Sequence, residues 1–202
     1  MFSEFATYLR LGIDHIADLQ GYDHIAFVVA LTAGYRSREW RRLLVLVTAF
    51  TAGHSLTLLL ATLDVVHATP RVVEPLIAST ILVTGTRGLL AAVSEQSGRP
   101  STAPAPAPAM GAPWLMAAFF GLIHGLGFSN FLRTVLGTEE RLVVPLLGFN
   151  LGLEVGQLAI VAAALALSVV AERVGVRRRW WTIALSLAAA LVGLQMLVTR
   201  LR

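Results

Sequence analysis

Long apolar runs alternate with short polar segments along the whole chain. Runs of about 18 or more apolar residues are long enough to cross a hydrocarbon core of about 30 Å. The pattern therefore predicts an all-α fold, a polytopic integral membrane helical bundle with about six transmembrane helices. The predicted spans cover residues 22–35, 43–63, 72–93, 114–136, 142–171 and 180–198.

The segment before the first predicted span has a different pattern. Its apolar positions Phe2, Phe5, Leu9, Ile13 and Ile16 are separated by steps of three and four residues. This spacing predicts an amphipathic N-terminal helix lying at the membrane interface, and we expect no cleavable signal peptide. The first span has a short apolar part, so its polar beginning must face protein or water.

Alternating proline and alanine mark residues 101–113 as a semi-rigid linker between two groups of helices. We predict a single membrane domain over residues 1–202, with three helices in 1–93, a linker over 94–113 and three helices in 114–202. Three helices on either side of a linker would give the halves opposite topologies, an arrangement common in transporters. The two halves share no convincing sequence repeat.

Charge refines the predicted orientation. Only 14% of residues are charged against 56% hydrophobic, the formal net charge is +4, and every basic residue is arginine. The arginines gather between the first two spans and between the last two, which predicts that these loops are cytoplasmic and both termini outside. We expect a bacterial inner membrane protein whose partners are lipid and a metal ion. The arginines form no stripe suited to nucleic acid, and a homo-oligomer or accessory subunits are compatible with the sequence.

Several polar side chains fall at membrane depth, where an ionised group costs about 2.5–3.5 kcal/mol on insertion scales. Three histidines, His24, His54 and His124, come from three different spans, and Asp23 lies beside the first of them. The chain has no cysteine. Imidazole and carboxylate without thiolate form a ligand set for nickel, cobalt, zinc or iron. Asp23 could also fix the tautomer of a neighbouring imidazole.

A second group of polar residues lies along the fifth predicted span. Asn150, Glu154 and Gln157 are spaced i, i+4 and i+7, so they share one face that must point into the bundle. We predict Glu154 as a metal ligand, with Asn150, Gln157, Ser55 and Glu74 as supporting positions, although Glu74 before Pro75 suits a helix cap. Single membrane histidines are more often interhelical hydrogen bonders, so a purely structural role is the competing interpretation.

Glycines should let the fourth and fifth predicted spans approach closely and bring His124 towards Glu154. They are Gly121, Gly125, Gly127, Gly148, Gly152 and Gly156.

Four blocks of sequence resemble the HupE/UreJ family of membrane proteins. They are GIDHIADLQGYDHIAFVVAL (12–31), TAFTAGHSLTLLLA (48–61), FGLIHGLGFSNFL (120–132) and LLGFNLGLEVGQLAIV (146–161). Members are associated with hydrogenase and urease accessory functions and are taken to be nickel or cobalt permeases. By this resemblance, the family's characteristic polar positions fall on His15, Asp23, His24, His54, His124, Asn150 and Glu154, which adds His15 to the metal ligands.

Three functions compete at this point. The first is transport of a divalent transition metal, with nickel or cobalt as the substrate. The second is an intramembrane zinc-dependent hydrolase in which the same cluster activates water, with Glu154 as general base and Ser55 next to His54. The third is a non-transporting subunit whose buried acids and histidines only hold the bundle together. We favour transport, mainly through the resemblance, and do not expect an enzyme.

Overall fold

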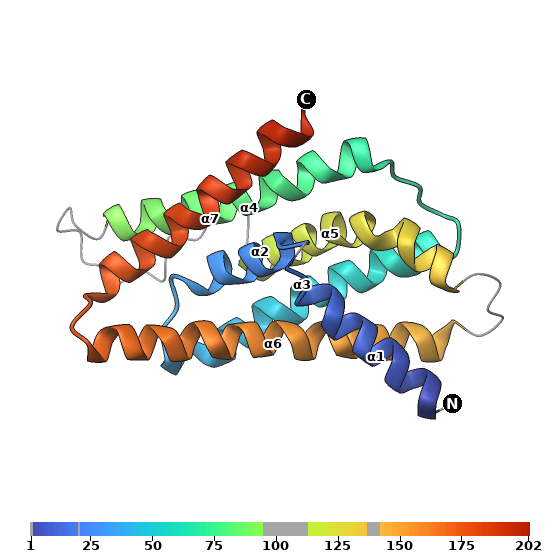
Figure 1. Ribbon diagram of the computed structural model, residues 1–202, viewed down its shortest axis with the longest axis horizontal. Helices are drawn as coiled ribbons and strands as arrows, with labels where there is room; N and C mark the ends of the chain where they lie inside the picture. The colour runs from blue at the N-terminus through green and yellow to red at the C-terminus, as the bar shows by residue number, and fades with distance from the viewer. Residues whose placement is uncertain (1, 20, 95–112, 137–141) are drawn as a thin grey trace.

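The computed structural model describes residues 2–19, 21–94, 113–136 and 142–202. Within these residues the chain forms seven α-helices and one short 3-10 turn, as the all-α prediction requires (Figure 1). The helices are α1 (Phe2–Ile16), α2 (Asp23–Thr32), α3 (Trp40–Thr62), α4 (Pro70–Ser94), α5 (Pro113–Leu136), α6 (Val143–Arg173) and α7 (Arg178–Arg200). Most of the predicted linker lies outside the described residues.

Five helices, α3 to α7, are long and apolar enough to cross a membrane. The predicted first span is the exception, because α2 has only ten residues. At 1.5 Å per residue it reaches about 15 Å, half of a hydrocarbon core. The number of full-length spans in the described chain is therefore five, with one short apolar helix beside them.

Helix α1 is the N-terminal helix that the spacing of the apolar positions predicts. It packs lengthwise on α6, with Gly148 against Phe5 and Tyr8, Gly152 against Leu9, and Gly156 against Ile13 and Ile16. The residue numbers rise together, so the two helices run parallel. A Cβ at Gly152 would overlap the carbonyl oxygen of Leu9, so this approach requires glycine.

Helices α1 and α2 together form one discontinuous path along the bundle. Figure 1 shows α1 running from the N-terminal end to the middle of the molecule, and α2 continuing from there towards the opposite end. α1 ends at Ile16 and α2 begins at Asp23, near mid-length (Figure 1). Two short helices therefore stand before the first full-length span, α3, and breaks of this kind form ligand sites in other membrane proteins.

Three closely packed helix pairs hold the bundle together. They are α1 with α6, α3 with α5, and α4 with α7. Each pair joins a helix before the linker to one after it. In the second pair, a Cβ at Gly121 would overlap the carbonyl oxygen of Phe50. The glycines of α5 thus face mainly α3, and those of α6 face α1. The expectation that they draw α5 and α6 together is wrong.

Candidate metal centre

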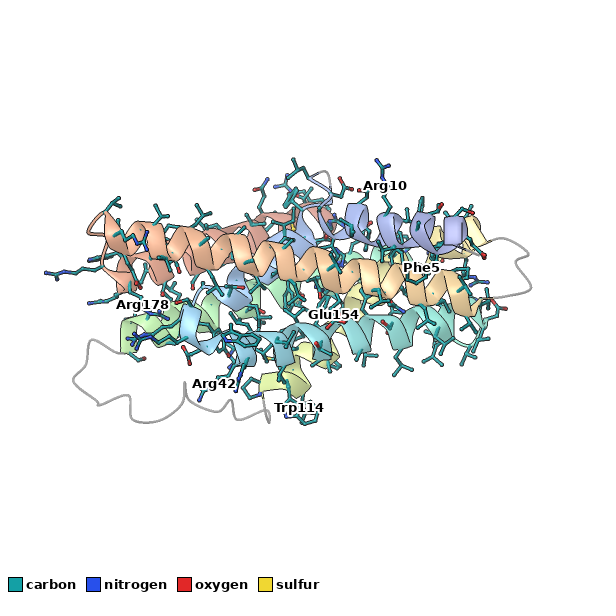
Figure 2. All side chains as sticks on the ribbon, turned by 90° about the horizontal axis from the view of Figure 1, so that it is seen from below. Phe5, Arg10, Arg42, Trp114, Glu154 and Arg178 are labelled. Carbon is teal, nitrogen blue, oxygen red and sulfur yellow. The ribbon has the colours of Figure 1, made fainter. Side chains whose placement is uncertain are left out.

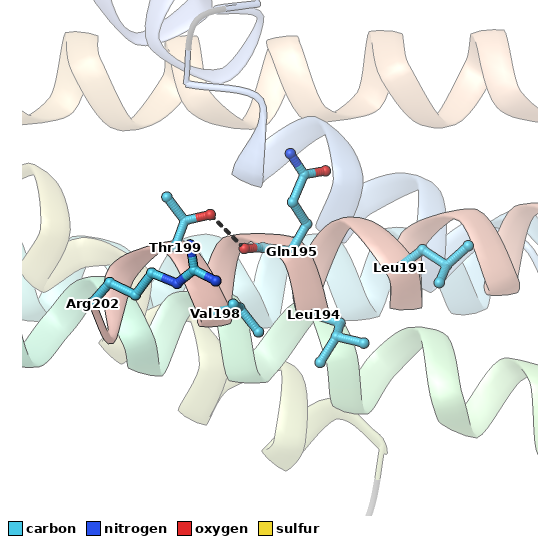
Figure 3. A pocket seen from close by; sticks show the side chains of 6 residues that line it. All are labelled: Leu191, Leu194, Gln195, Val198, Thr199 and Arg202. Atoms are coloured by element: carbon cyan, nitrogen blue, oxygen red, sulfur yellow. Dashed lines mark hydrogen bonds between the residues drawn. The ribbon is translucent and has the colours of Figure 1, made fainter.

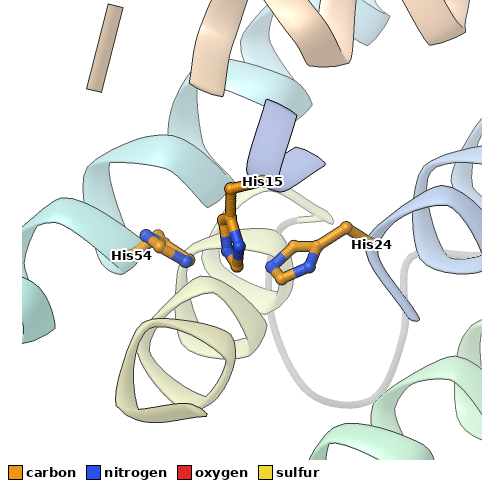
Figure 4. Close-up of side chains that lie close together, drawn as sticks. All are labelled: His15, His24 and His54. Carbon is orange, nitrogen blue, oxygen red and sulfur yellow. The ribbon is translucent and has the colours of Figure 1, made fainter. Parts of the chain in front are cut away.

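Three histidines meet where the discontinuous helix breaks (Figure 4). His15 lies in the last turn of α1, His24 in the first turn of α2, and His54 in the second half of α3. Each offers a ring nitrogen, and these nitrogens all lie within 4.8 Å of one another. A tetrahedral ion with bonds of about 2.0–2.1 Å needs nitrogens about 3.3 Å apart, so modest side-chain movement would close the site.

Four of the six ring nitrogens of His15, His24 and His54 are buried without a hydrogen-bond partner. His54 is fully buried, and neither of its nitrogens has a hydrogen-bond partner. The Nε2 atoms of His15 and His24 are likewise buried without a partner. Buried polar atoms are normally paired, and leaving one unpaired costs about 1–3 kcal/mol. Such a concentration of unpaired nitrogens is the pattern expected where a ligand completes the site.

Asp23 fixes the orientation of one of these rings. Its Oδ1 lies 3.0 Å from Nδ1 of His24 and accepts the His24 backbone N–H at 2.8 Å. A carboxylate in this position accepts a hydrogen bond from Nδ1–H and so keeps the proton on Nδ1, which leaves the lone pair of Nε2 free to face the cluster. These two contacts are the geometry that a carboxylate needs to fix the tautomer of the neighbouring imidazole, as the sequence suggested for Asp23.

His124 of α5 extends the cluster on one side. Its ring is fully buried and lies 4.9 Å from the ring of His24, measured between centroids. It does not belong to the group of three whose nitrogens lie within 4.8 Å. Its Nε2 lies 2.8 Å from the hydroxyl oxygen of Thr80 in α4.

Phenylalanine pairs enclose the four histidines from both directions along the bundle. Phe128 stacks on Phe149, and the Phe128 ring centre is 3.8 Å from that of His15. On the other side Phe27 stacks on Phe50, and both lie about 5 Å from His124. The cluster therefore has an apolar wall towards each end of the molecule.

The polar stripe of α6 is used differently from the prediction. Glu154 lies near the middle of the bundle's length (Figure 2), but its Oε1 accepts a 2.6 Å hydrogen bond from the Thr48 hydroxyl. Gln157 accepts a 2.7 Å bond from Thr51 in the same way. Both side chains are thus hydrogen-bonded to α3, and Glu154 does not belong to the group formed by His15, His24 and His54. Asn150 is half-buried, with an unpaired Oδ1.

Two other supporting positions also lie elsewhere. The hydroxyl of Ser55 donates to the carbonyl oxygen of Thr51 in its own helix. Glu74 pairs with Arg200 at 2.9 Å, joining the beginning of α4 to the end of α7. Within the described residues neither forms a hydrogen bond or ion pair with the histidines, so their structural roles are local.

A groove on α7 is lined by residues that suit lipid contact rather than a metal (Figure 3). It is formed by Leu191, Leu194, Gln195, Val198, Thr199 and Arg202.

Sequence reasoning missed the residues that shape the cluster. Thr48, Thr51 and Thr80 carry no signal in a single sequence, because threonine is common in membrane helices, where its hydroxyl bonds its own backbone. The four phenylalanines look like ordinary apolar positions. Only their placement one turn from a histidine, as at Phe50 and Phe128, could have suggested that they enclose a site.

Comparison with known proteins gives one match. The family model described as HupE / UreJ protein matches residues 1–200, which is nearly the whole chain. No curated protein and no solved structure matches.

Proposed function

Because the chain belongs to the HupE/UreJ family, we propose that it transports a divalent transition metal ion, with nickel or cobalt as substrate. The observation that carries the proposal is the meeting of His15, His24 and His54 at the break of the discontinuous helix. Neutral imidazoles without thiolate suit these borderline metals. The nickel or cobalt assignment rests on the family resemblance together with this ligand chemistry.

The position of the cluster supports a carrier rather than a surface binding site. The C-terminal end of α1, which carries partial negative charge, points to the same place as the three imidazoles. Broken helices in transporters place substrate ions at such ends near mid-membrane. An ion held here would be about equally far from both ends of the bundle.

We propose that the arginine-rich end faces the cytoplasm. Arg42 and Arg178 lie towards one end of the molecule, opposite Phe5 (Figure 2). The positive-inside rule then places both termini outside, in a bacterial inner membrane. A divalent cation moving inward would gain about 4.6 kcal/mol per 100 mV of membrane potential.

The hydrolase alternative has less support. Three histidines could hold zinc with one position open to water. However, the proposed general base Glu154 accepts from Thr48, and Ser55 donates to its own helix. No described carboxylate other than that of Asp23 hydrogen-bonds a cluster histidine, and Asp23 is held by His24.

The test is nickel binding and uptake by the purified protein in proteoliposomes. We expect wild-type protein to bind nickel reversibly and to accumulate it under an inside-negative potential. His15→Ala, His24→Ala and His54→Ala should lose both activities. His67→Ala is the matched control, because His67 is an exposed histidine in the loop after α3.

Two results would overturn the proposal. Absence of binding and uptake in the wild type would leave only a structural role for the histidines. Metal that copurifies at one ion per chain, resists exchange and disappears with His54→Ala would indicate a fixed cofactor and an enzyme.

A further inference from the structure

The proton on His124 can be assigned from the contacts of Thr80. The Thr80 hydroxyl donates its single hydrogen to the carbonyl oxygen of Ile77 at 2.7 Å. The 2.8 Å contact between this oxygen and Nε2 of His124 must then use a proton carried by the imidazole. Neutral His124 is therefore protonated at Nε2, and its Nδ1 presents a lone pair.

That lone pair is available for a ligand. Nδ1 of His124 is buried and has no hydrogen-bond partner, and the residue is fully enclosed. The His124 and His24 ring centres are 4.9 Å apart at an interplanar angle of 69°. Two imidazoles on one tetrahedral ion have ring centres about 5 Å apart, so this spacing suits a shared metal.

The four histidines have an order along the bundle. His15 contacts Phe128 of α5 and Phe149 of α6, which lie towards the end of the bundle where α1 begins. His124 contacts Phe27 and Phe50, towards the arginine-rich end. His24 lies between them, within 4.6 to 5.7 Å of His15, His54 and His124.

We propose that His24 belongs to two successive metal stations. The outer station is His15, His24 and His54, and the inner station is His24 with His124, whose tautomer is set by Thr80. An ion passes inward by exchanging His15 and His54 for Nδ1 of His124 while it stays bound to Nε2 of His24. This inference rests on the proposed transport function. Thr80 is a positioning residue that acts through His124.

The test separates binding from transfer. Thr80→Val keeps the volume but removes the acceptor, and Thr80→Ser keeps the acceptor. Nickel affinity, measured by equilibrium binding in detergent, should stay near the wild-type value in both variants. Nickel uptake into proteoliposomes should fall about 10-fold or more in Thr80→Val and recover in Thr80→Ser, since outer partners of metal-binding histidines have effects of 10- to 100-fold.

Magnetic resonance of isotope-labelled histidine gives a readout that a purely structural role would not move. The His124 signal, assigned by its absence in His124→Ala, should report a proton on Nε2 in the wild type and a changed tautomer in Thr80→Val. If Thr80→Val does not fold, the His124→Ala variant replaces it, with binding retained and uptake lost.

The outcomes separate the two proposals. Wild-type uptake with equal uptake by Thr80→Val, or a proton found on Nδ1 of His124, overturns the two stations and leaves transport standing. Loss of binding in step with loss of uptake indicates a single station. A wild type that neither binds nor transports nickel overturns the transport proposal and this inference with it.

Discussion

Two groups of polar residues lie inside the same bundle and have opposite hydrogen-bond states. In the stripe of α6, Glu154 and Gln157 each accept a hydrogen bond from a threonine hydroxyl of α3, and only Asn150 has an unpaired oxygen. The histidine cluster is unsatisfied, because both nitrogens of His54 are buried without a partner. The comparison shows that depth in a membrane does not identify a binding residue. The state of its hydrogen bonds separates a group that holds helices together from one that awaits a ligand.

The largest expected effect is on the cluster side of this comparison. His54→Leu removes one of three imidazoles at nearly constant volume, so nickel affinity should fall by more than about 100-fold, beyond the loss typical of an outer partner. No hydrogen bond is lost, so the metal-free protein should be as stable as the wild type or more stable. Isothermal titration and thermal unfolding in detergent measure the two quantities. Retained affinity would remove His54 from the ligands.

The opposite result is expected in the stripe. Thr51→Val leaves the buried Gln157 oxygen without a donor, so the free energy of unfolding should fall by about 1–3 kcal/mol. Nickel binding should not change, because neither residue belongs to the grouped ligands. The same two measurements apply. A loss of affinity in a stably folded Thr51→Val protein would mean that the stripe and the cluster act as one site.

A smaller effect should follow from Glu154→Gln, which keeps an acceptor for the Thr48 hydroxyl and removes the negative charge. We expect the free energy of unfolding to change by less than about 1 kcal/mol and the nickel affinity to change little. This variant tests the prediction that Glu154 is a ligand. A 10-fold or larger loss of affinity would restore it to the site.

The smallest effect belongs to an exposed contact in the loop after α3. Hydrogen bonding from His67, and the charge of Arg133, hold the pKa of the Asp64 carboxyl below its usual range. When folding lowers the pKa of a carboxyl, the folded state is stabilised at pH values above the pKa of the unfolded chain. This stabilisation is lost as the pH falls through the pKa of the folded state. Asp64→Asn should lower the melting temperature slightly at neutral pH and not in acid. A difference of equal size in acid would exclude this ion pair as its cause.

The sequence predicted most helices because long apolar runs determine them directly. The boundaries of α4 and α5 fall within two residues of the prediction. The partner of the first helix could not be predicted, since an amphipathic pattern is the same whether the apolar face meets lipid or another helix. Glycines four residues apart on α6 were a sign of close packing, but one sequence does not say which helix fills the groove.

The sequence allowed us to name most residues of the candidate site, but not the contacts that they make. His24, His54 and His124 stand out because imidazoles are costly at membrane depth. Glu154 was placed with them by the same reasoning, yet its side chain meets Thr48 instead. Helical periodicity gives the face a residue occupies. It does not give the neighbour across that face, and Thr80 could not be found without the fold.

The parallel contact of α1 with α6 also bears on biogenesis. α2 is too short to span a membrane and α1 is amphipathic, so neither is retained as an ordinary transmembrane segment when it leaves the ribosome. The groove that receives α1 lies on α6, which is synthesised only after most of the chain. His15 therefore reaches His54 late, after the long helices are in place. Until then the nascent protein has no assembled histidine cluster.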